Sequence, residues 1–235
     1  MISPKKVLLT GSTGFVGSFV LENLRCSGRF STSVAVRNGG GACDATVHVL
    51  GNFDNSTDWR PALAGVDVVI HCAALAHVER GGTEDALADF RLVNRDACLR
   101  LAEQAAGEGV KRFIFLSSIG VCGNHTEAEP FHEDLEPAPI GPYAISKFEA
   151  EKGLSSIHQR TGLEVVIIRP PLVYGPNAPG NFGKLVNLVD RKIPLPLGAV
   201  HNKRTLVSVY NLADLIITCI GHPNAANEVF LAGDG

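Results

Sequence analysis

Long apolar runs are absent from this sequence. A helix that crosses a bilayer needs about 18–20 consecutive apolar residues, and no stretch of the 235 residues approaches that length. The apolar stretch behind Lys5 and Lys6 is also too short for a signal peptide and leads directly into glycines. Strong charge is missing too: the net charge of −3 indicates neither a nucleic-acid nor an anionic-membrane surface. We therefore expect a cytoplasmic protein with a small-molecule partner.

Paired cysteines and metal-ligand motifs are also missing. None of the six cysteines belongs to a CxxC pair, and several lie in apolar segments, where a free thiol packs as a small hydrophobic group. This pattern favours a reducing compartment over a disulfide framework. The eight histidines show no HExxH motif or other paired-ligand spacing, so we expect no metal site.

What the sequence does contain is a regular alternation of short apolar runs and helical segments. Such alternation predicts right-handed crossovers and an α/β fold with a Rossmann-type, doubly wound parallel sheet. The expected strands are Lys5–Thr10, Thr32–Arg37, Thr46–Leu50, Asp67–Ala73, Arg112–Ser118 and Leu163–Pro170. The expected helices cover about Val16–Ser27, Ala86–Glu108 and Tyr143–Arg160.

The composition of the sequence changes after Pro170. Residues 171–235 are rich in Pro, Gly and Asn, with short helical or strand pieces between them, and "VFLAGDG" at the end reads as a sheet strand and turn. We therefore expect a dinucleotide-binding domain over 1–170. Residues 171–235 are expected to supply substrate-binding loops interleaved with the last strands, since such loops extend from the carboxyl edge of a parallel sheet.

Three glycines, Gly11, Gly14 and Gly17, directly follow the first expected strand and lead into a helix. Glycines permit a tight turn, close approach of the backbone to a pyrophosphate and close packing of helix on sheet, while the helix N-terminus attracts the anion. Their position between a strand and a helix favours a dinucleotide site over an ordinary turn.

The end of the second expected strand indicates which dinucleotide is bound. An acidic residue there holds the ribose hydroxyls of NAD, whereas an arginine accommodates the 2′-phosphate of NADP. Here the strand ends in "VAVRN", with Arg37 and no Asp or Glu nearby. NADP(H) is therefore favoured, NAD(H) remains possible, and the alternative for Arg37 is an ordinary solvated side chain.

Tyr143 and Lys147, in "YAISK", are four residues apart on an expected helix. Such a pair can be an ordinary aromatic–cation contact on a helix surface. However, the helix begins beside the carboxyl edge of the sheet, where the strand ending in Ser117 and Ser118 also ends. A phenol is normally protonated to about pH 10, and a lysine charge together with a positive cofactor ring would lower its pKa. The three groups then suit proton transfer to or from an alcohol during hydride transfer.

With "HCAA" at 71–74, "RLVNRD" around Asn94, "FLSSIGVCG" and "RPPLVYGP", these motifs resemble the extended short-chain dehydrogenase/reductase superfamily. Within it the chain resembles the NAD-dependent epimerase/dehydratase family, which acts on nucleotide sugars, over essentially its whole length. The resemblance implies that Ser118, Tyr143 and Lys147 are catalytic, with Tyr143 as the acid/base. The cofactor-binding residues that it implies are Gly11, Thr13, Gly14, Phe15, Val16, Gly17, Arg37, Asn52, Phe53, Cys72, Ala73, Ala74, Asn94, Ser117, Tyr143, Lys147 and Pro170.

The same resemblance implies a nucleotide-sugar substrate, most similar to the UDP-sugars of surface-polysaccharide synthesis. Asn181 in "GNF" corresponds to a diphosphate or nucleotide contact, and Arg204 to an arginine that pairs with the phosphates, a role that suits a bidentate guanidinium. Ser118 would also touch the sugar, and His77 is a further candidate. Family members often dimerise through the two long helices, so a homodimer is expected.

Departures from the family pattern narrow the reaction. Dehydratases of the family carry Asp and Glu after the active-site threonine, whereas Ile119 and Gly120 follow Ser118 here. Neither can protonate a leaving group, so dehydration is disfavoured, and C4 epimerisation and 4-keto reduction remain. Cys122 replaces a usual tyrosine, and Asn52 a usual aspartate near the adenine.

Three interpretations stay open. The leading one is a nucleotide-sugar C4 epimerase or 4-keto reductase. A second is a dehydrogenase or reductase of a non-sugar ketone or alcohol, against which Asn181 and Arg204 argue because such substrates carry no diphosphate. A third is a cofactor-binding module that is catalytically incomplete, since family members commonly continue beyond the point where this chain stops. On that view, cofactor binding is expected to survive better than turnover.

Overall fold

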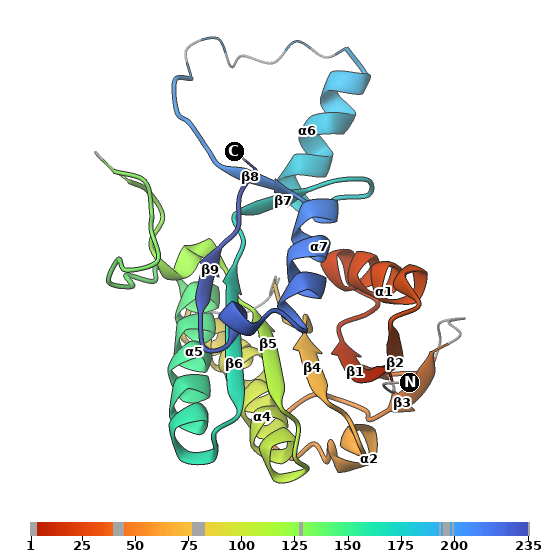
Figure 1. Ribbon diagram of the computed structural model, residues 1–235. Coiled ribbons are helices and arrows are strands. Elements are labelled where there is room, and N and C mark those ends of the chain that lie inside the picture. Colours follow the sequence, from red (N-terminus) through yellow and green to blue (C-terminus); the bar gives the residue numbers. More distant parts are fainter. Residues whose placement is uncertain are drawn as a thin grey trace.

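The protein folds around one parallel sheet with helices on both faces, as the computed structural model in Figure 1 shows. The structure describes residues 4–39, 45–76, 83–126, 129–192, 194, 198 and 200–234, and in two helices the side chains of 83–85 and Asn181 lie outside this description. No helix within these ranges is long and apolar enough to cross a membrane.

Within the described ranges, the main sheet has seven strands in the order β3-β2-β1-β4-β5-β6-β9, and every neighbouring pair is parallel. This order reverses between β1 and β4, as in a doubly wound Rossmann fold, which confirms the predicted fold class. The strands are β1 (Lys5–Thr10), β2 (Phe30–Val36), β3 (Thr46–Val49), β4 (Val68–His71), β5 (Arg112–Leu116), β6 (Glu164–Arg169) and β9 (Val229–Leu231). The run "VFL" near the end is therefore a sheet strand, as predicted.

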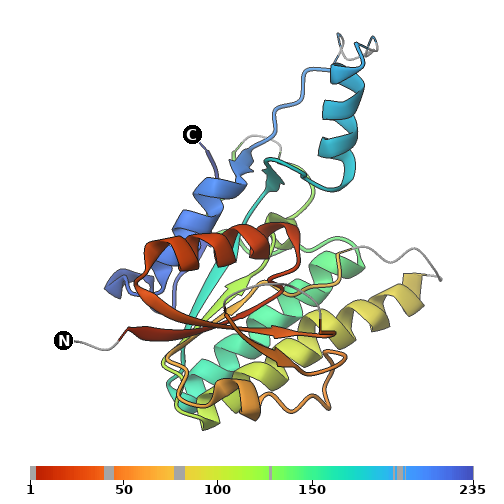
Figure 2. The same cartoon turned by 90° about the vertical axis from the view of Figure 1, so that its right-hand side faces the viewer.

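Helices cover both faces of the sheet because its strands are apolar on both sides. Val7 and Leu9 of β1 pack in one core with α1 (Phe15–Ser27) and α7 (Val209–Cys219), whereas Leu8 packs in the other core. That second core contains α2 (Arg60–Leu63), α4 (Ala97–Gly107) and α5 (Pro142–Thr161). Figure 2 shows the two helical layers on opposite sides of the sheet.

One expected helix is interrupted. The sequence predicts a continuous helix over Ala86–Glu108, but α3 (Thr83–Phe90) is separated from α4 by a π-helical turn, η1 (Arg91–Asp96). The buried Asn94 lies in this turn, and its side chain bonds the backbone of Leu75, far away in sequence. A π-turn re-aims side chains within a helix and is frequent at functional sites. The periodicity of apolar residues does not report such a long-range bond.

A smaller unit lies beyond the carboxyl edge of the main sheet. It contains a two-stranded parallel sheet, β7 (Leu172–Tyr174) with β8 (Leu206–Ser208), and α6 (Gly180–Asp190), which projects away from the body in both views. Val186 and Val189 of α6 are about half exposed, at 49% and 59%. Single-turn helices η2 (Ile119–Val121) and η3 (Pro223–Ala225) complete the described elements.

Candidate active site

The glycine turn after β1 is tightly packed and leaves room on its outer side. Gly11 has φ +76°, and a Cβ on it would lie 2.5 Å from the backbone nitrogen of Ala73. A Cβ on Gly17 would lie 2.0 Å from the carbonyl oxygen of Gly11, so α1 packs directly on the turn. Gly14, which caps α1, is exposed, as is Thr13. The exposed helix N-terminus therefore suits a pyrophosphate, and the residues fit a dinucleotide.

The other predicted cofactor residues lie along the same edge of the sheet, because parallel strands all end on one side. Arg37 follows β2 and is exposed, Cys72 to Ala74 follow β4, and Pro170 follows β6. Phe15 and Val16 begin α1 and are partly buried. This edge at the β1/β4 reversal is where ligands bind in such sheets.

Asn52 and Phe53 follow β3 and differ in their surroundings. Phe53 is buried with its ring centroid 4.6 Å from that of Trp59, so its ring supports the loop from within. Asn52 is exposed, and its carbonyl oxygen accepts a hydrogen bond from the hydroxyl of Thr57. The side chain of Asn52 is thus the one on the outer surface.

Lys147 is almost completely buried, with 1% of its surface exposed. Its Nζ donates a hydrogen bond of 2.8 Å to the carbonyl oxygen of Leu116 and lies 4.5 Å from the ring centroid of Phe115. Burial lowers the pKa of Lys147 to about 8, because the charged form loses its hydration. An ordinary helix-surface pair is therefore excluded: Lys147 is held inside the protein at the end of β5.

Tyr143 begins the same helix, and its ring meets that of Phe90 edge to face, with centroids 5.9 Å apart. Burial raises the pKa of Tyr143 to about 12. The sequence led us to expect a lowered pKa for Tyr143, from the lysine charge together with a positive cofactor ring, so the direction of this shift is the opposite. In the chain by itself the loss of hydration dominates, and the amine of Lys147 bonds a carbonyl oxygen.

The two serines after β5 have different surroundings. Ser117 is buried and its hydroxyl donates to Glu151, whereas Ser118 is partly exposed and its Oγ accepts from the Gly120 N–H at 3.1 Å. A Cβ on Gly120 would lie 3.4 Å from that Oγ and 3.6 Å from the Cβ of Ala144. Ser118 is therefore beside the start of α5, and it is the serine whose side chain reaches the outer side.

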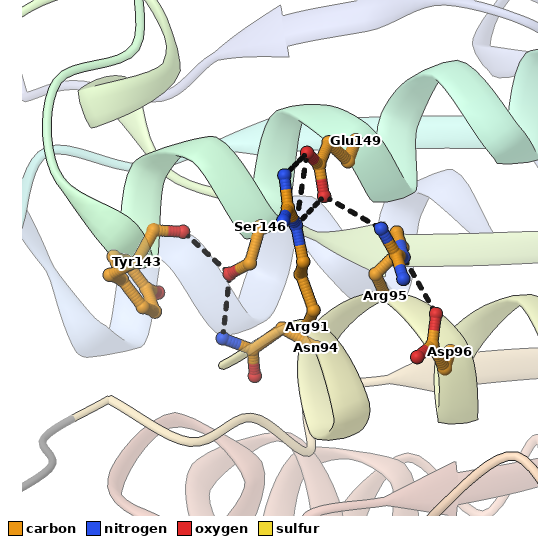
Figure 3. A network of polar contacts seen from close by, with 7 residues as sticks. All are labelled: Arg91, Asn94, Arg95, Asp96, Tyr143, Ser146 and Glu149. Carbon is orange, nitrogen blue, oxygen red and sulfur yellow. Dashed lines mark hydrogen bonds and ion pairs between the residues drawn. The ribbon is translucent and has the colours of Figure 1, made fainter. Parts of the chain in front are cut away.

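Asn94 connects three segments around Tyr143, and Figure 3 shows its link through Ser146 to Tyr143. Its Nδ2 donates to the carbonyl oxygen of Leu75 and, at 3.1 Å, to the hydroxyl of Ser146, which donates to the carbonyl oxygen of Tyr143. Its Oδ1 accepts from the Leu75 N–H. All polar atoms of the Asn94 side chain thus bond the protein, and this side chain positions the loop after β4 and the first turn of α5.

The predicted substrate residues are not brought together with this cluster by the described contacts. Arg204 is exposed in the segment before β8. The side chain of Asn181 lies outside the described residues, as does the whole of His77. In the parts of the chain that the structure describes, no cluster of three His, Cys, Asp or Glu residues could hold a metal ion.

Sequence reasoning missed a buried ion pair directly behind Ser117. Glu151 and Arg169 have 5% and 6% of their side chains exposed and are 2.6 Å apart. Cys122, whose place in the motif had no explanation, is buried with its Sγ 3.5 Å from a guanidinium nitrogen of Arg169. The available signal was the helical spacing: Glu151 follows Lys147 by four residues and Tyr143 by eight, which places all three on one face of α5.

A Rossmann sheet with a tightly packed glycine turn at its carboxyl edge defines the class of α/β proteins that bind dinucleotides. Residues 7–233 match the family model described as "NAD dependent epimerase/dehydratase family". The chain belongs to this family, as its motifs led us to expect.

Two curated relatives carry the same description at different distances. The UDP-glucose 4-epimerase of Vibrio cholerae is 47% identical over 234 residues, which cover 99% of this chain and 71% of that relative. The UDP-glucose 4-epimerase of Mycolicibacterium smegmatis is 29% identical over 247 residues, covering 98% and 77% of the two chains.

Solved structures show the same architecture. MoeE5 in complex with UDP-glucose and NAD has a TM-score of 0.81 at 25% identity, covering 98% of this chain and 76% of that one. The UDP-N-acetylglucosamine 4-epimerase of Bacillus cereus has a TM-score of 0.84 at 23% identity, with 98% and 76% covered. The second likeness bears on the fold alone.

Proposed function

We propose that the protein is an NAD-dependent nucleotide-sugar 4-epimerase whose substrate is a UDP-hexose. The observation that carries the proposal is the 47% identity, along 99% of this chain, to the UDP-glucose 4-epimerase of Vibrio cholerae. The site geometry supports it, because a partly exposed serine, a tyrosine and a buried lysine lie at the edge of the sheet where the glycine turn suits a pyrophosphate.

In this proposal the residues divide the work on the C4 hydroxyl. Tyr143 takes the proton of that hydroxyl and returns it when the alcohol is re-formed. Lys147, held at the end of β5, places a positive charge where it stabilises the phenolate. Ser118 donates a hydrogen bond to the same sugar oxygen and fixes its position. When bound, the nicotinamide supplies the hydride acceptor and donor for C4.

Two features bear on which reaction of the family is performed. Ile119 and Gly120 follow Ser118 in η2, and neither carries a group that protonates a leaving hydroxyl, so the proposal excludes dehydration. Inversion at C4 requires that the 4-keto sugar turn over within the site before hydride returns. We place the diphosphate near α6 and Arg204, the segments beyond the carboxyl edge of the sheet.

A second candidate, a 4-keto reductase that uses NADPH, is favoured by one observation. Arg37 is exposed directly after β2 with no acidic neighbour in "VRN", the arrangement that accommodates a 2′-phosphate. A UDP-glucose complex of a 25% identical neighbour contains NAD, which supports the epimerase instead. A preference for NADP stays a prediction. It is wrong if NAD binds at least as tightly as NADP and Arg37→Ala leaves that ratio unchanged.

The division into residues 1–170 and 171–235, the homodimer and a role in surface-polysaccharide synthesis remain parts of the proposal. Light scattering tests the dimer by its mass. The proposed dimer would form through α4 and α5. On these helices the side chains of Glu103 and Arg160 are 51% and 60% exposed.

The test of the function is a two-part experiment on the purified chain. The nucleotide released by denaturation is first identified, and the protein is then incubated with UDP-glucose while UDP-galactose is measured. We expect copurified NAD and interconversion without added cofactor. An empty protein that binds NADPH and reduces UDP-4-keto sugars instead identifies the reductase. Cofactor binding without either turnover leaves only the binding module.

A further inference from the structure

Behind Ser117, where the site joins the sheet, the structure contains a buried network of charged groups. One Glu151 carboxylate oxygen accepts hydrogen bonds from the Ser117 hydroxyl and, at 3.1 Å, from Arg169 Nε, while the other accepts from Arg169 Nη2. The guanidinium also approaches Cys122. Three elements thus meet at one carboxylate: α5 through Glu151, the end of β5 through Ser117, and the end of β6 through Arg169.

This network is adjacent to the groups that are proposed to act on the sugar. Lys147, one helical turn before Glu151, bonds the Leu116 carbonyl oxygen, and Glu151 bonds the next residue, Ser117. The backbone N–H of Ser117 donates to Ile168, and that of Ile119 to Pro170. The residues on either side of Ser118 are therefore both bonded to the backbone at the end of β6. The side chain of Ser117, the residue before it, is bonded to Glu151 on α5.

The burial of this pair is costly, which argues for a purpose beyond stability. Taking two ions out of water is repaid only when the geometry is good and the remaining lone pairs are bonded, and an apolar pair of similar size is often as stable. Charged hydrogen bonds, however, impose distances and directions that apolar contacts do not. We propose that Glu151 and Arg169 are positioning residues, which hold Ser118 on the β5–β6 end at a fixed distance from Tyr143 and Lys147 on α5.

This inference rests on the proposed function for its kinetic readout. Its second readout is independent of turnover: the protein has only three tyrosines, Tyr143, Tyr174 and Tyr210, so the Cζ signal of Tyr143 in ¹³C-tyrosine-labelled protein can be assigned by substitution. The titratable groups around Lys147 and the Glu151–Arg169 pair are His71 and Cys72 at β4, Cys98 of α4 and Cys122 after η2.

Two variants separate positioning from the burial of charge. Glu151→Gln keeps the shape but leaves the Arg169 charge unpaired, so kcat should fall about 10- to 100-fold, the melting temperature should fall, and the Tyr143 signal should shift. The double variant Glu151→Gln with Arg169→Met removes both charges. We expect it to recover the melting temperature but neither kcat nor the Tyr143 signal. KM should change less than kcat in both variants.

The matched control is Glu164→Gln. Glu164 pairs with Arg112 at 2.7 Å and joins β5 and β6 at their amino ends, away from Ser118. The Glu164→Gln variant should therefore keep kcat and the Tyr143 signal at wild-type values. Recovery of kcat by the double variant would overturn the proposal and assign the pair a purely structural role. An unchanged Tyr143 signal in Glu151→Gln would overturn it too. A wild-type protein without epimerase activity whose Tyr143 signal still responds to Glu151→Gln would refute the function and leave the positioning role supported.

Discussion

The two edges of the parallel sheet treat charge in opposite ways. At the carboxyl edge, Lys147, Glu151 and Arg169 are 1%, 4% and 5% exposed. At the amino edge, Arg112 is buried with 8% of its side chain exposed, but its partner Glu164 keeps 41% exposed, and the pair of Arg160 with Glu103 is mostly solvated.

The difference shows at which edge of the sheet the fold includes the desolvation cost of a fully buried ion pair. Solvated pairs contribute little to stability and cost little, whereas buried ions must be held in place by several bonds. Among the ion pairs of the described residues, the pair with both partners buried lies at the edge that carries the glycine turn and Tyr143, as expected where side chains must be oriented for chemistry. The following predictions test this contrast between the edges, from the largest effect to the smallest.

The largest effect is expected from Tyr143→Phe, which removes the hydroxyl of the proposed proton carrier and keeps the ring packed against Phe90. Epimerase kcat should fall about 10²- to 10⁴-fold, while the affinity for the cofactor changes little. The exposed Tyr210 provides the control as Tyr210→Phe, with kcat unchanged. Coupled spectrophotometric assays measure both. Near wild-type kcat in Tyr143→Phe would remove this residue from the chemistry.

A large effect is also expected in the pH dependence of stability. The pKa of Lys147 is lowered to about 8 in the folded protein and is about 10.4 in an unfolded chain. Between these values the unfolded state binds more protons, so stability rises with pH. The free energy of unfolding of the wild type should therefore rise relative to Lys147→Met by about 2 kcal/mol between pH 8 and pH 10.

Urea titrations at several pH values measure this difference. Below about pH 7 lysine is charged in both states, so the difference between the two proteins should be constant there. The titrations should stop near pH 10. Above that value the unfolded state loses the Tyr143 proton while the folded state keeps it, because burial raises the pKa of Tyr143 to about 12, so stability falls again. A difference that does not vary with pH would show that Lys147 is hydrated.

A smaller effect is expected from methyl groups placed at the two edges. Gly17→Ala inserts a Cβ 2.0 Å from the Gly11 carbonyl oxygen, which should destabilise the protein by about 1–3 kcal/mol and weaken cofactor binding. Gly107→Ala, at the end of α4, meets nothing within 4 Å and should stabilise by about 0.4–1 kcal/mol. Thermal unfolding measures both. Equal melting temperatures would contradict the packing described for the turn.

The smallest effect is expected at the amino edge. Glu103→Gln removes the carboxylate that pairs with Arg160 at 3.4 Å in solvent, so the free energy of unfolding should change by at most about 0.5 kcal/mol and kcat should not change. A larger loss in urea unfolding would show that solvated pairs matter as much as the buried ones and would end the contrast between the edges.

Most of the sheet could be predicted because its strands are short apolar runs separated by turn residues. The predicted bounds of β1, Lys5–Thr10, agree with the structure residue for residue, and those of β6 differ by one residue at each end. Gly11, Gly14 and Gly17 could be placed because a strand and a helix flank them. The π-turn at Asn94 could not, since it depends on a bond to Leu75 that periodicity does not encode.

Helical spacing could place Glu151 on the face of Tyr143 and Lys147, but it could not give Arg169 as its partner. The two partners are 18 residues apart, on a helix and a strand whose neighbours were predicted separately. The family resemblance named Ser118 rather than Ser117, but what packs around each serine appears only in the fold, where Ser117 is buried against Glu151.

By itself, the sequence determined the parallel α/β architecture, the glycine turn and the helical pair of Tyr143 and Lys147, because local pattern and spacing encode strands, helices and turns. The tertiary structure decided how deeply Lys147 is buried and in which direction the pKa values of Lys147 and Tyr143 shift. It also decided that Glu151 pairs with Arg169. Burial and hydration depend on every element that surrounds a group, so these properties arise only when distant segments of the chain are packed together.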